Sequence, residues 1–202
     1  MSRNSLKNML ANLVALFFIS GFSALIYQVS WQRLLFTGFG VDLTSITVII
    51  SIFMLGLGIG AFFGGRIADR FPKKIILLFC CIELLIGIFG FMSYSAIHWL
   101  QEIMIHSSMF IMIFGVFLLL LIPTFLMGST LPLLTAFFNH HISNIGESIG
   151  QLYFYNTLGA AMGALSTGFI LFNFLTLSQT LMLAASFNIL ISLSIFMLYG
   201  RK

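Results

Sequence analysis

The stretch GLGIGAFFGGRIADRFPKK, residues 56–74, decides the fold, because an apolar helical pattern runs directly into a charged turn. Gly56, Gly60 and Gly64 are four residues apart and therefore lie on one face of a helix. In a membrane, such a stripe of small residues lets a second helix approach closely. The nine residues that begin at Arg66 hold four cations and one acid. The stretch predicts two membrane-spanning helices joined by a short basic hairpin.

The composition predicts an integral membrane protein. Hydrophobic residues make up 60% of the 202-residue chain and charged residues 7%, whereas a soluble domain carries about 25% charged residues. The mean hydropathy is +1.12. The net charge of +4 is confined to short connections and the chain ends, which indicates membrane topology and no nucleic-acid partner. Cys80 and Cys81 are adjacent in an apolar run, a spacing that does not fit a metal site.

Six apolar segments predict an all-α bundle of six transmembrane helices, a single domain over residues 1–202. The first segment is too long for the apolar region of a signal peptide and is expected to remain uncleaved. The fourth contains Pro123 and Pro132, which predict a kinked or broken helix. The expected spans are residues 9–30, 43–65, 75–97, 107–138, 149–172 and 179–199.

The distribution of Lys and Arg predicts that both termini face the cytoplasm. In this orientation eight of the nine cations lie on the inner side and only Arg33 lies outside, as expected from the excess of cations in cytoplasmic loops. The expected location is therefore a cytoplasmic membrane, the bacterial inner membrane.

Glu83 is the only acid within a predicted span and is the first functional candidate. A carboxylate at this depth is unfavourable unless it is protonated, paired or facing water. Two interpretations follow: a proton-coupling or cation-binding group, or a structural acid held by hydrogen bonds. Asn156 on the fifth helix likewise fits either an interhelical hydrogen bond or a contact with substrate.

Further polar residues on the first and fourth helices are candidates for lining a cavity. Trp31 and Arg33 fit an interfacial belt as well as a cavity, while Tyr27 and Gln28 lie one turn deeper. Thr124, Ser129 and Thr130 lie between the two prolines of the fourth helix. Hydroxyl groups there either bond carbonyls of their own helix or help a broken helix to bind a ligand.

The residue pattern predicts neither an enzyme nor a cofactor or metal site. No nucleophile–base pair or phosphate-binding loop stands out. His140 and His141 lie in a polar loop without a cysteine or acid at the spacing of a metal site.

Several stretches resemble known transporters. Gly65, Asp69 and Arg70, followed by two lysines, resemble the loop signature of the major facilitator superfamily, although Pro72 stands where a second glycine is usual. Residues 20–33 (SGFSALIYQVSWQR), 123–132 (PTFLMGSTLP) and 153–160 (YFYNTLGA) resemble the membrane portion of fused transporter/spermidine-synthase proteins. The likeness covers essentially all six helices. The chain ends at Lys202, so the likeness does not extend to the synthase domain of those proteins.

The resemblance implies half of a twelve-helix transporter, which would form a homodimer around a central substrate site. It implies that the second and fifth helices form the dimer interface and that the first and fourth line the cavity. Gly65, Asp69 and Arg70 would form a cytoplasmic gate. Glu83 is the proton-coupling candidate because of its position within a span, but the resemblance places its helix outside the cavity, which argues against direct contact with the solute. The interface glycines would be Gly56, Gly60, Gly64, Gly159 and Gly163, and the cavity residues Tyr27, Gln28, Trp31, Arg33, Thr124, Ser129 and Asn156.

The predicted function is secondary transport of a small polar solute by alternating access. A polyamine would require carboxylates, whereas Arg33 would suit a carboxylate-bearing metabolite. The expected partners are a second copy of the chain, membrane lipid and the solute. The alternative is a membrane anchor or assembly subunit for a soluble cytoplasmic enzyme similar to spermidine synthase. A channel or lipid-handling protein is a third, weaker hypothesis, based on the 24 phenylalanines.

Overall fold

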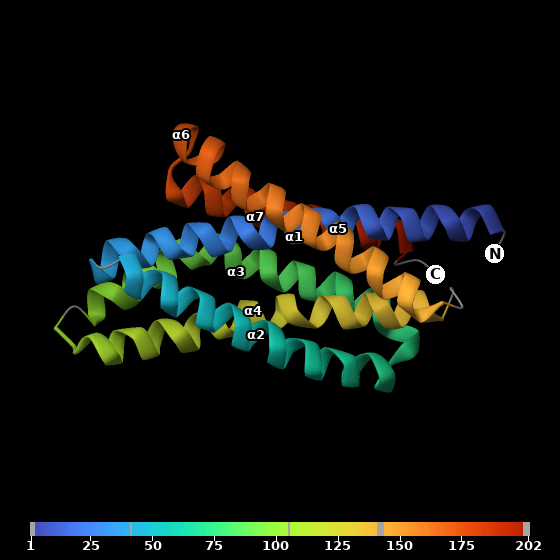
Figure 1. Ribbon diagram of the computed structural model, residues 1–202, viewed down its shortest axis with the longest axis horizontal. Helices are drawn as coiled ribbons and strands as arrows, with labels where there is room; N and C mark the ends of the chain where they lie inside the picture. The colour runs from blue at the N-terminus through green and yellow to red at the C-terminus, as the bar shows by residue number, and fades with distance from the viewer. Residues whose placement is uncertain (1–2, 41, 105, 141–143, 200–202) are drawn as a thin grey trace.

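The computed structural model describes residues 3–40, 42–104, 106–140 and 144–199. Every regular element in these ranges is a helix, and six are long and apolar enough to cross a membrane. The chain is therefore an integral membrane protein. The six long helices run side by side in an elongated bundle (Figure 1).

Each long helix corresponds to one predicted span, and most extend beyond it. The bounds are α1 Arg3–Phe39, α2 Asp42–Arg70, α3 Ile75–Ile103, α4 Met109–Asn139, α5 Ile145–Ser166 and α7 Leu177–Tyr199. α4 begins two residues later than predicted, and α5 ends at Ser166, before the predicted end of its span at residue 172. Three short elements join them: the 3₁₀-helix η1 Pro72–Lys74, the π-helix η2 Thr167–Leu171 and the helix α6 Phe172–Phe174.

The charged hairpin is shorter than predicted, because α2 continues through Arg70. No helix-breaking residue occurs before Pro72, so backbone hydrogen bonding continues to the end of the apolar segment and past it. The Arg66 guanidinium lies over the Phe62 ring, 3.8 Å from its centroid, so this exposed cation covers apolar surface of its own helix.

The fourth helix is not broken, contrary to one of the two expected outcomes. α4 runs from Met109 to Asn139 with both prolines inside it. Three hydroxyls form hydrogen bonds within this helix. Thr124 donates to the carbonyls of Leu120 and Leu121 at 2.9 and 3.1 Å. Ser129 and Thr130 donate to Leu126 and Met127, each at 2.7 Å.

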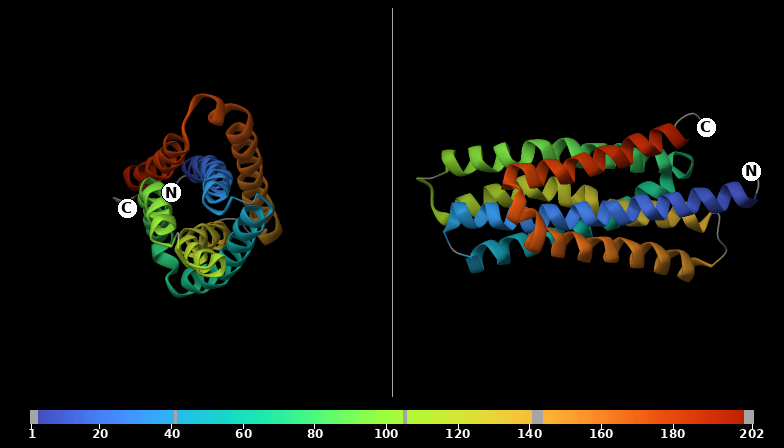
Figure 2. Two further views of the ribbon diagram at one scale, coloured as in Figure 1. Left: turned by 90° about the vertical axis from the view of Figure 1, so that its left-hand side faces the viewer. Right: turned by 90° about the horizontal axis from the view of Figure 1, so that it is seen from above.

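The helices alternate in direction, so α1 begins and α7 ends at the same end of the bundle (Figure 2). The connection from α2 to α3, which contains η1, also lies there, and we call this the hairpin end. The other end holds the connections from α1 to α2 and from α3 to α4.

The closest helix pairs are α2 with α4, α1 with α5 and α3 with α7. The view along the bundle shows α1 enclosed between α5 and α7, while α2, α3 and α4 complete the bundle below it (Figure 2, left). The middle of α1 is therefore the segment around which the other long helices pack.

The α2 glycines do not form a dimer interface, which corrects that expectation. Gly56, Gly60 and Gly64 are buried against α4 of the same chain. A methyl group at Gly60 would overlap the Phe125 carbonyl, and one at Gly64 would lie 2.7 Å from the Ser129 Cα. Close packing by small residues was thus predicted correctly, but the partner helix was not.

The α5 glycines are also used within the chain. A methyl group at Gly159 or Gly163 would overlap the backbone carbonyls of Phe18 and Phe22 on α1. On α1 itself, Gly21 meets the backbone of Asn156 in the same way. These three glycines bring α1 and α5 into backbone contact, and Gly159 and Gly163 are not free for a second subunit.

Candidate functional site

A pocket of about 350 Å³ lies near the midpoints of the helices. Pockets that bind small molecules have volumes of about 300–1,000 Å³. Helices α1, α2, α4, α5 and α7 all contribute to its walls, and amide and hydroxyl side chains interrupt an otherwise apolar lining. The lining residues are Ser20, Gly21, Ala24, Leu25, Gln28, Phe53, Met54, Leu57, Met127, Thr130, Tyr153, Asn156, Thr157, Ala160 and Asn188.

The spacing of the α1 residues explains how this helix forms the floor of the pocket. Ser20, Ala24 and Gln28 are four residues apart, so they share one helix face, and all three line the pocket. Facing them on α5, Asn156 and Ala160 have the same spacing. The backbone contact at Gly21 brings these two faces together.

Glu83 lies behind the pocket wall and is fully buried. Ser20 Oγ donates a hydrogen bond to Glu83 Oε1 at 2.6 Å, and Asn188 Nδ2 donates to Oε2 at 2.6 Å. Both donors line the pocket, whereas Glu83 itself does not. The carboxyl group is therefore separated from the pocket by the two side chains that bind it.

Asn188 has unused capacity to accept hydrogen bonds. Its Oδ1 atom is buried and has no partner in the described part of the chain. A buried, unpartnered amide oxygen is unfavourable by about 1–3 kcal/mol. This atom could be satisfied by a water, by a ligand that donates a hydrogen bond, or by rotation of the amide if Glu83 presented a proton.

The same interface between α3 and α7 holds a second polar pair one turn closer to the hairpin end. Ser192 Oγ donates to the Cys80 carbonyl at 2.9 Å, and the Cys80 thiol lies 3.3 Å from the Ser192 carbonyl. Cys80 is buried and Cys81 is exposed. Polar contacts thus continue along the buried face of α3 on which Glu83 lies.

Asn156 makes the interhelical hydrogen bond that was one of its two expected roles. Its Nδ2 donates to the Phe17 carbonyl on α1 at 3.1 Å, so the interhelical hydrogen bond exists. It is half-buried and lines the pocket together with Gln28. The structure brings these two predicted cavity residues together.

Tyr27 and Trp31 are core residues, which corrects their assignment to the cavity. Both are fully buried, and their rings stack with centroids 5.0 Å apart. Trp31 also packs against Phe53 and Phe89. The Tyr27 hydroxyl lies against Gly90 on α3. Both side chains therefore point away from the pocket face of α1.

Arg33 does not reach the pocket. It is exposed, and its guanidinium lies 4.6 Å from the centroid of the Phe172 ring near the end opposite the hairpin. This position agrees with an interfacial cation and not with a cavity residue.

Thr124 and Ser129 also lie outside the pocket, which corrects a further assignment. Both are buried, and they meet Gly56 and Gly64 at the interface between α2 and α4. The α4 residues that do line the pocket are Met127 and Thr130. They lie on a different face of the same helix.

The three predicted gate residues are only partly grouped. Gly65 and Asp69 line a second groove of about 350 Å³ at the hairpin end, between α2 and α4. Arg70 does not line it and lies 5.7 Å from the centroid of the Phe71 ring. Asp69 is exposed and makes no ion pair within the described residues.

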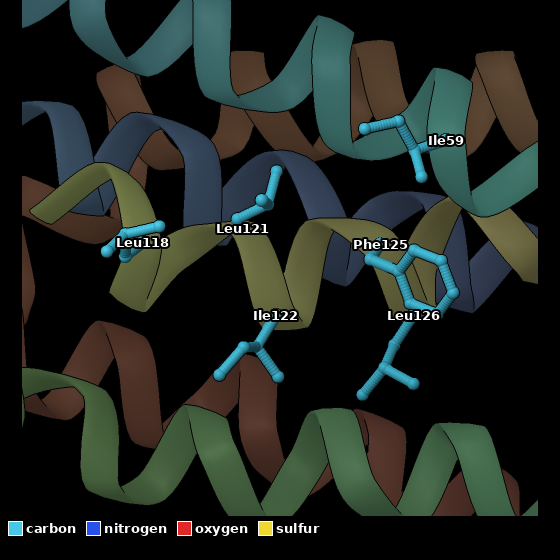
Figure 3. A pocket seen from close by; sticks show the side chains of 6 residues that line it. All are labelled: Ile59, Leu118, Leu121, Ile122, Phe125 and Leu126. Carbon is cyan, nitrogen blue, oxygen red and sulfur yellow. The ribbon is translucent and has the colours of Figure 1, made fainter. Parts of the chain in front are cut away.

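An apolar groove of about 540 Å³ between α2 and α4 contrasts with the central pocket. Figure 3 shows its six side chains, Ile59 on α2 and five on α4, all without polar atoms. Ile122 is 58% exposed. This surface suits lipid acyl chains and offers a polar solute no hydrogen bond.

The described residues contain no group of three or more His, Cys, Asp or Glu side chains that could hold a metal ion. His140 is exposed, and His141 lies outside the described residues.

Thr130, one of the three hydroxyl residues predicted beside the prolines, does line the pocket, whereas sequence analysis made no prediction for Ser20, Thr157 and Asn188. Two signals could have found some of them. Ser20 precedes Gln28 by eight residues and therefore shares its helix face. Asn188 is an amide within the last apolar span, where polar side chains usually contact another polar group.

Comparison of the chain with protein-family models, with curated proteins and with solved structures found no match.

Proposed function

We propose that the chain is one half of a secondary transporter for a small polar solute. The observation that supports this most is the central pocket, which combines Gln28, Asn156 and Thr157 near the middle of an apolar bundle. Polar side chains at this depth are unfavourable against lipid and need a partner, which a polar solute in the pocket would supply. The unpartnered Asn188 oxygen adds an acceptor at the same wall.

The charges around the pocket favour a neutral or cationic solute. None of the described residues that line it is a Lys or Arg, and Glu83 lies directly behind two of them. A carboxylate in a medium of low dielectric attracts a cation and repels an anion. This argues against a metabolite with a net negative charge, because Arg33, the expected partner of its carboxylate, lies elsewhere.

A homodimer would close the pocket. Met54 on α2 and Tyr153 on α5 line the pocket and are 62% and 60% exposed. In a single chain surrounded by lipid, amide groups behind this opening would face acyl chains, which is unfavourable. A second copy that packs against α2 and α5 would shelter these amide groups from lipid. Large side chains such as Met54 and Tyr153, and not the predicted glycines, would then form the interface.

In this proposal the hairpin end faces the cytoplasm, in a bacterial inner membrane. The basic residues Arg66, Arg70, Lys73 and Lys74 lie at that end, as the bias of cations toward cytoplasmic loops requires. Asp69, beside the groove at this end, would take part in gating as the two copies rock between inward-open and outward-open states.

Transport is tested with the purified full chain in proteoliposomes that contain a pH-sensitive dye. Spermidine serves as the cationic probe, alanine as the zwitterionic probe and succinate as the anionic probe, each with and without a proton gradient. We expect a proton-coupled signal with spermidine or alanine and none with succinate. Uptake of succinate alone would contradict the charge argument, and no flux for any probe would contradict transport of these solutes.

The dimer is tested by disulfide cross-linking in native-like lipid. In a background with Cys80 and Cys81 replaced by alanine, a cysteine at Met54 should cross-link two chains. A matched cysteine at Phe91 on α3, which is 41% exposed, should not. Cross-linking at Phe91 but not at Met54 would place the interface on α3 and refute a dimer through α2 and α5.

A further inference from the structure

A groove at the hairpin end is lined by one lysine and otherwise mostly by apolar side chains. It has a volume of about 210 Å³ and lies between the start of α3 and the end of α7. Lys73 on η1 is at one end, and aliphatic and aromatic side chains continue toward the middle of the bundle. The lining residues are Lys73, Ile76, Leu77, Cys80, Ile195, Phe196 and Tyr199.

The apolar part of the groove faces the membrane. Leu77 and Phe196 are 53% and 59% exposed, and both belong to predicted spans. From Lys73 to Cys80 the groove follows about two turns of helix, or roughly 10 Å at 1.5 Å per residue. This length accommodates the upper part of one acyl chain.

Lys73 has no carboxylate partner among the described residues, where the one ion pair joins His98 and Glu102. Lys73 and Lys74 form the last turn of η1, at the level where the apolar segment begins. Tyr199, the last residue of α7, also lines the groove. An unpaired ammonium on an apolar groove complements a phosphate attached to an acyl chain.

We propose that this groove binds one acidic phospholipid, with its phosphate at Lys73 and one acyl chain between α3 and α7. The proposal is independent of transport, because the groove shares no residue with the central pocket. It also means that the outer face of α3 and α7 contacts lipid and not a second copy of the chain. The site would fix the level of the hairpin end in the membrane.

Native mass spectrometry of the full chain tests the proposal, with phosphatidylglycerol and phosphatidylcholine of identical acyl chains as probes. One lysine near a membrane surface changes affinity for acidic lipid about fivefold. We expect phosphatidylglycerol to bind about fivefold more tightly, and Lys73→Gln to abolish that preference. Lys74→Gln is the matched control, since it removes the same charge one residue away from the groove. Glycerol phosphate, which lacks acyl chains, should not compete.

A second variant tests the apolar part. Leu77→Trp should fill the groove and weaken binding of both lipids, whereas Leu84→Trp, on the same helix but outside the groove, should not. Equal effects of Lys73→Gln and Lys74→Gln would indicate a diffuse charge effect and overturn the proposal. Full competition by glycerol phosphate, retained binding in Leu77→Trp, or a chain dimer through α3 and α7 would overturn it as well.

Discussion

The hydrogen bonds of Glu83 lead to opposite expectations for two substitutions at this position. In Glu83→Gln, the new carbonyl can still accept from Ser20 Oγ. The new NH₂ group would face Asn188 Nδ2, but Asn188 can rotate its amide and present Oδ1, which has no partner in the wild type. Two hydrogen bonds exist before and after the change, so we expect the free energy of unfolding to change by less than about 1 kcal/mol.

Glu83→Ala should be clearly destabilising. It removes both hydrogen bonds, and interhelical hydrogen bonds in membranes contribute on average about 0.6 and at most about 1.7 kcal/mol each. It also leaves a cavity at a fully buried position, and large-to-small substitutions in cores reduce stability by about 2–5 kcal/mol. Together these terms predict a loss of roughly 3–6 kcal/mol, and Ser20 and Asn188 would both lack their partner.

Equilibrium unfolding in mixed micelles, followed by circular dichroism, measures both variants against the wild type. The functional readout is proton-coupled uptake in proteoliposomes, which Glu83→Gln should abolish because an amide does not exchange a proton. Glu102→Gln is the matched control, because Glu102 is an exposed acid paired with His98 far from the pocket. If Gln and Ala destabilise the chain equally, the amide-rotation argument is wrong. If proton-coupled uptake survives in Glu83→Gln, Glu83 is structural.

Three further predictions concern packing, the pocket and the hairpin end. Gly60→Val should reduce the free energy of unfolding by about 1–3 kcal/mol through overpacking against α4. Gly58→Val should be neutral in the same unfolding assay, because no atom lies within 4 Å of a methyl group at that position. Equal effects of the two variants would refute the packing argument. Asn156→Ala should reduce stability by only about 0.6 kcal/mol and lower the rate of uptake at least tenfold, and a variant with unchanged uptake would remove Asn156 from the solute site. Asp69→Asn should leave the melting temperature unchanged, because Asp69 makes no ion pair within the described residues, but should slow uptake; wild-type uptake rates would exclude a gating role.

The six helices and two of their buried polar residues could be predicted from sequence, because the membrane restricts what an apolar segment and a polar side chain within it can do. A long apolar run must be helical, and a polar group inside it must find a partner. Glu83 and Asn156 stand out on this basis, and the structure gives both of them hydrogen-bond partners on other helices.

The direction in which α1 presents its polar residues could not be predicted. Tyr27 and Gln28 are neighbours in sequence, yet they point about 100° apart on the helix. Only Gln28 faces the pocket, whereas Tyr27 packs against α3. α1 has packed neighbours on several sides, so its residue pattern has no single polar face that would indicate its rotation.

The partner of a glycine stripe could not be predicted for a related reason. The spacing of Gly56, Gly60 and Gly64 shows that some helix must approach closely, but any helix with suitable residues would satisfy it. The structure shows that α4 does so, with Thr124 and Ser129 as the facing residues. The packing of α2 against α4 thus accounts for five wrong assignments. The three glycines predicted for a dimer interface and the two hydroxyl residues predicted for the cavity all lie between these two helices.

The arrangement of large and small residues on α2 and α5 supports a specific kind of association. Gly56, Gly60 and Gly64 on α2 and Gly159 and Gly163 on α5 face inward and hold the subunit together, whereas the outward faces carry large side chains such as Met54 and Tyr153. Large flexible side chains can slide past those of a partner more easily than backbones in close contact can. In the proposed transport cycle, two copies rock against each other. Close glycine packing would keep each subunit rigid, and the large side chains on the outward faces of α2 and α5 would let the two subunits move relative to each other.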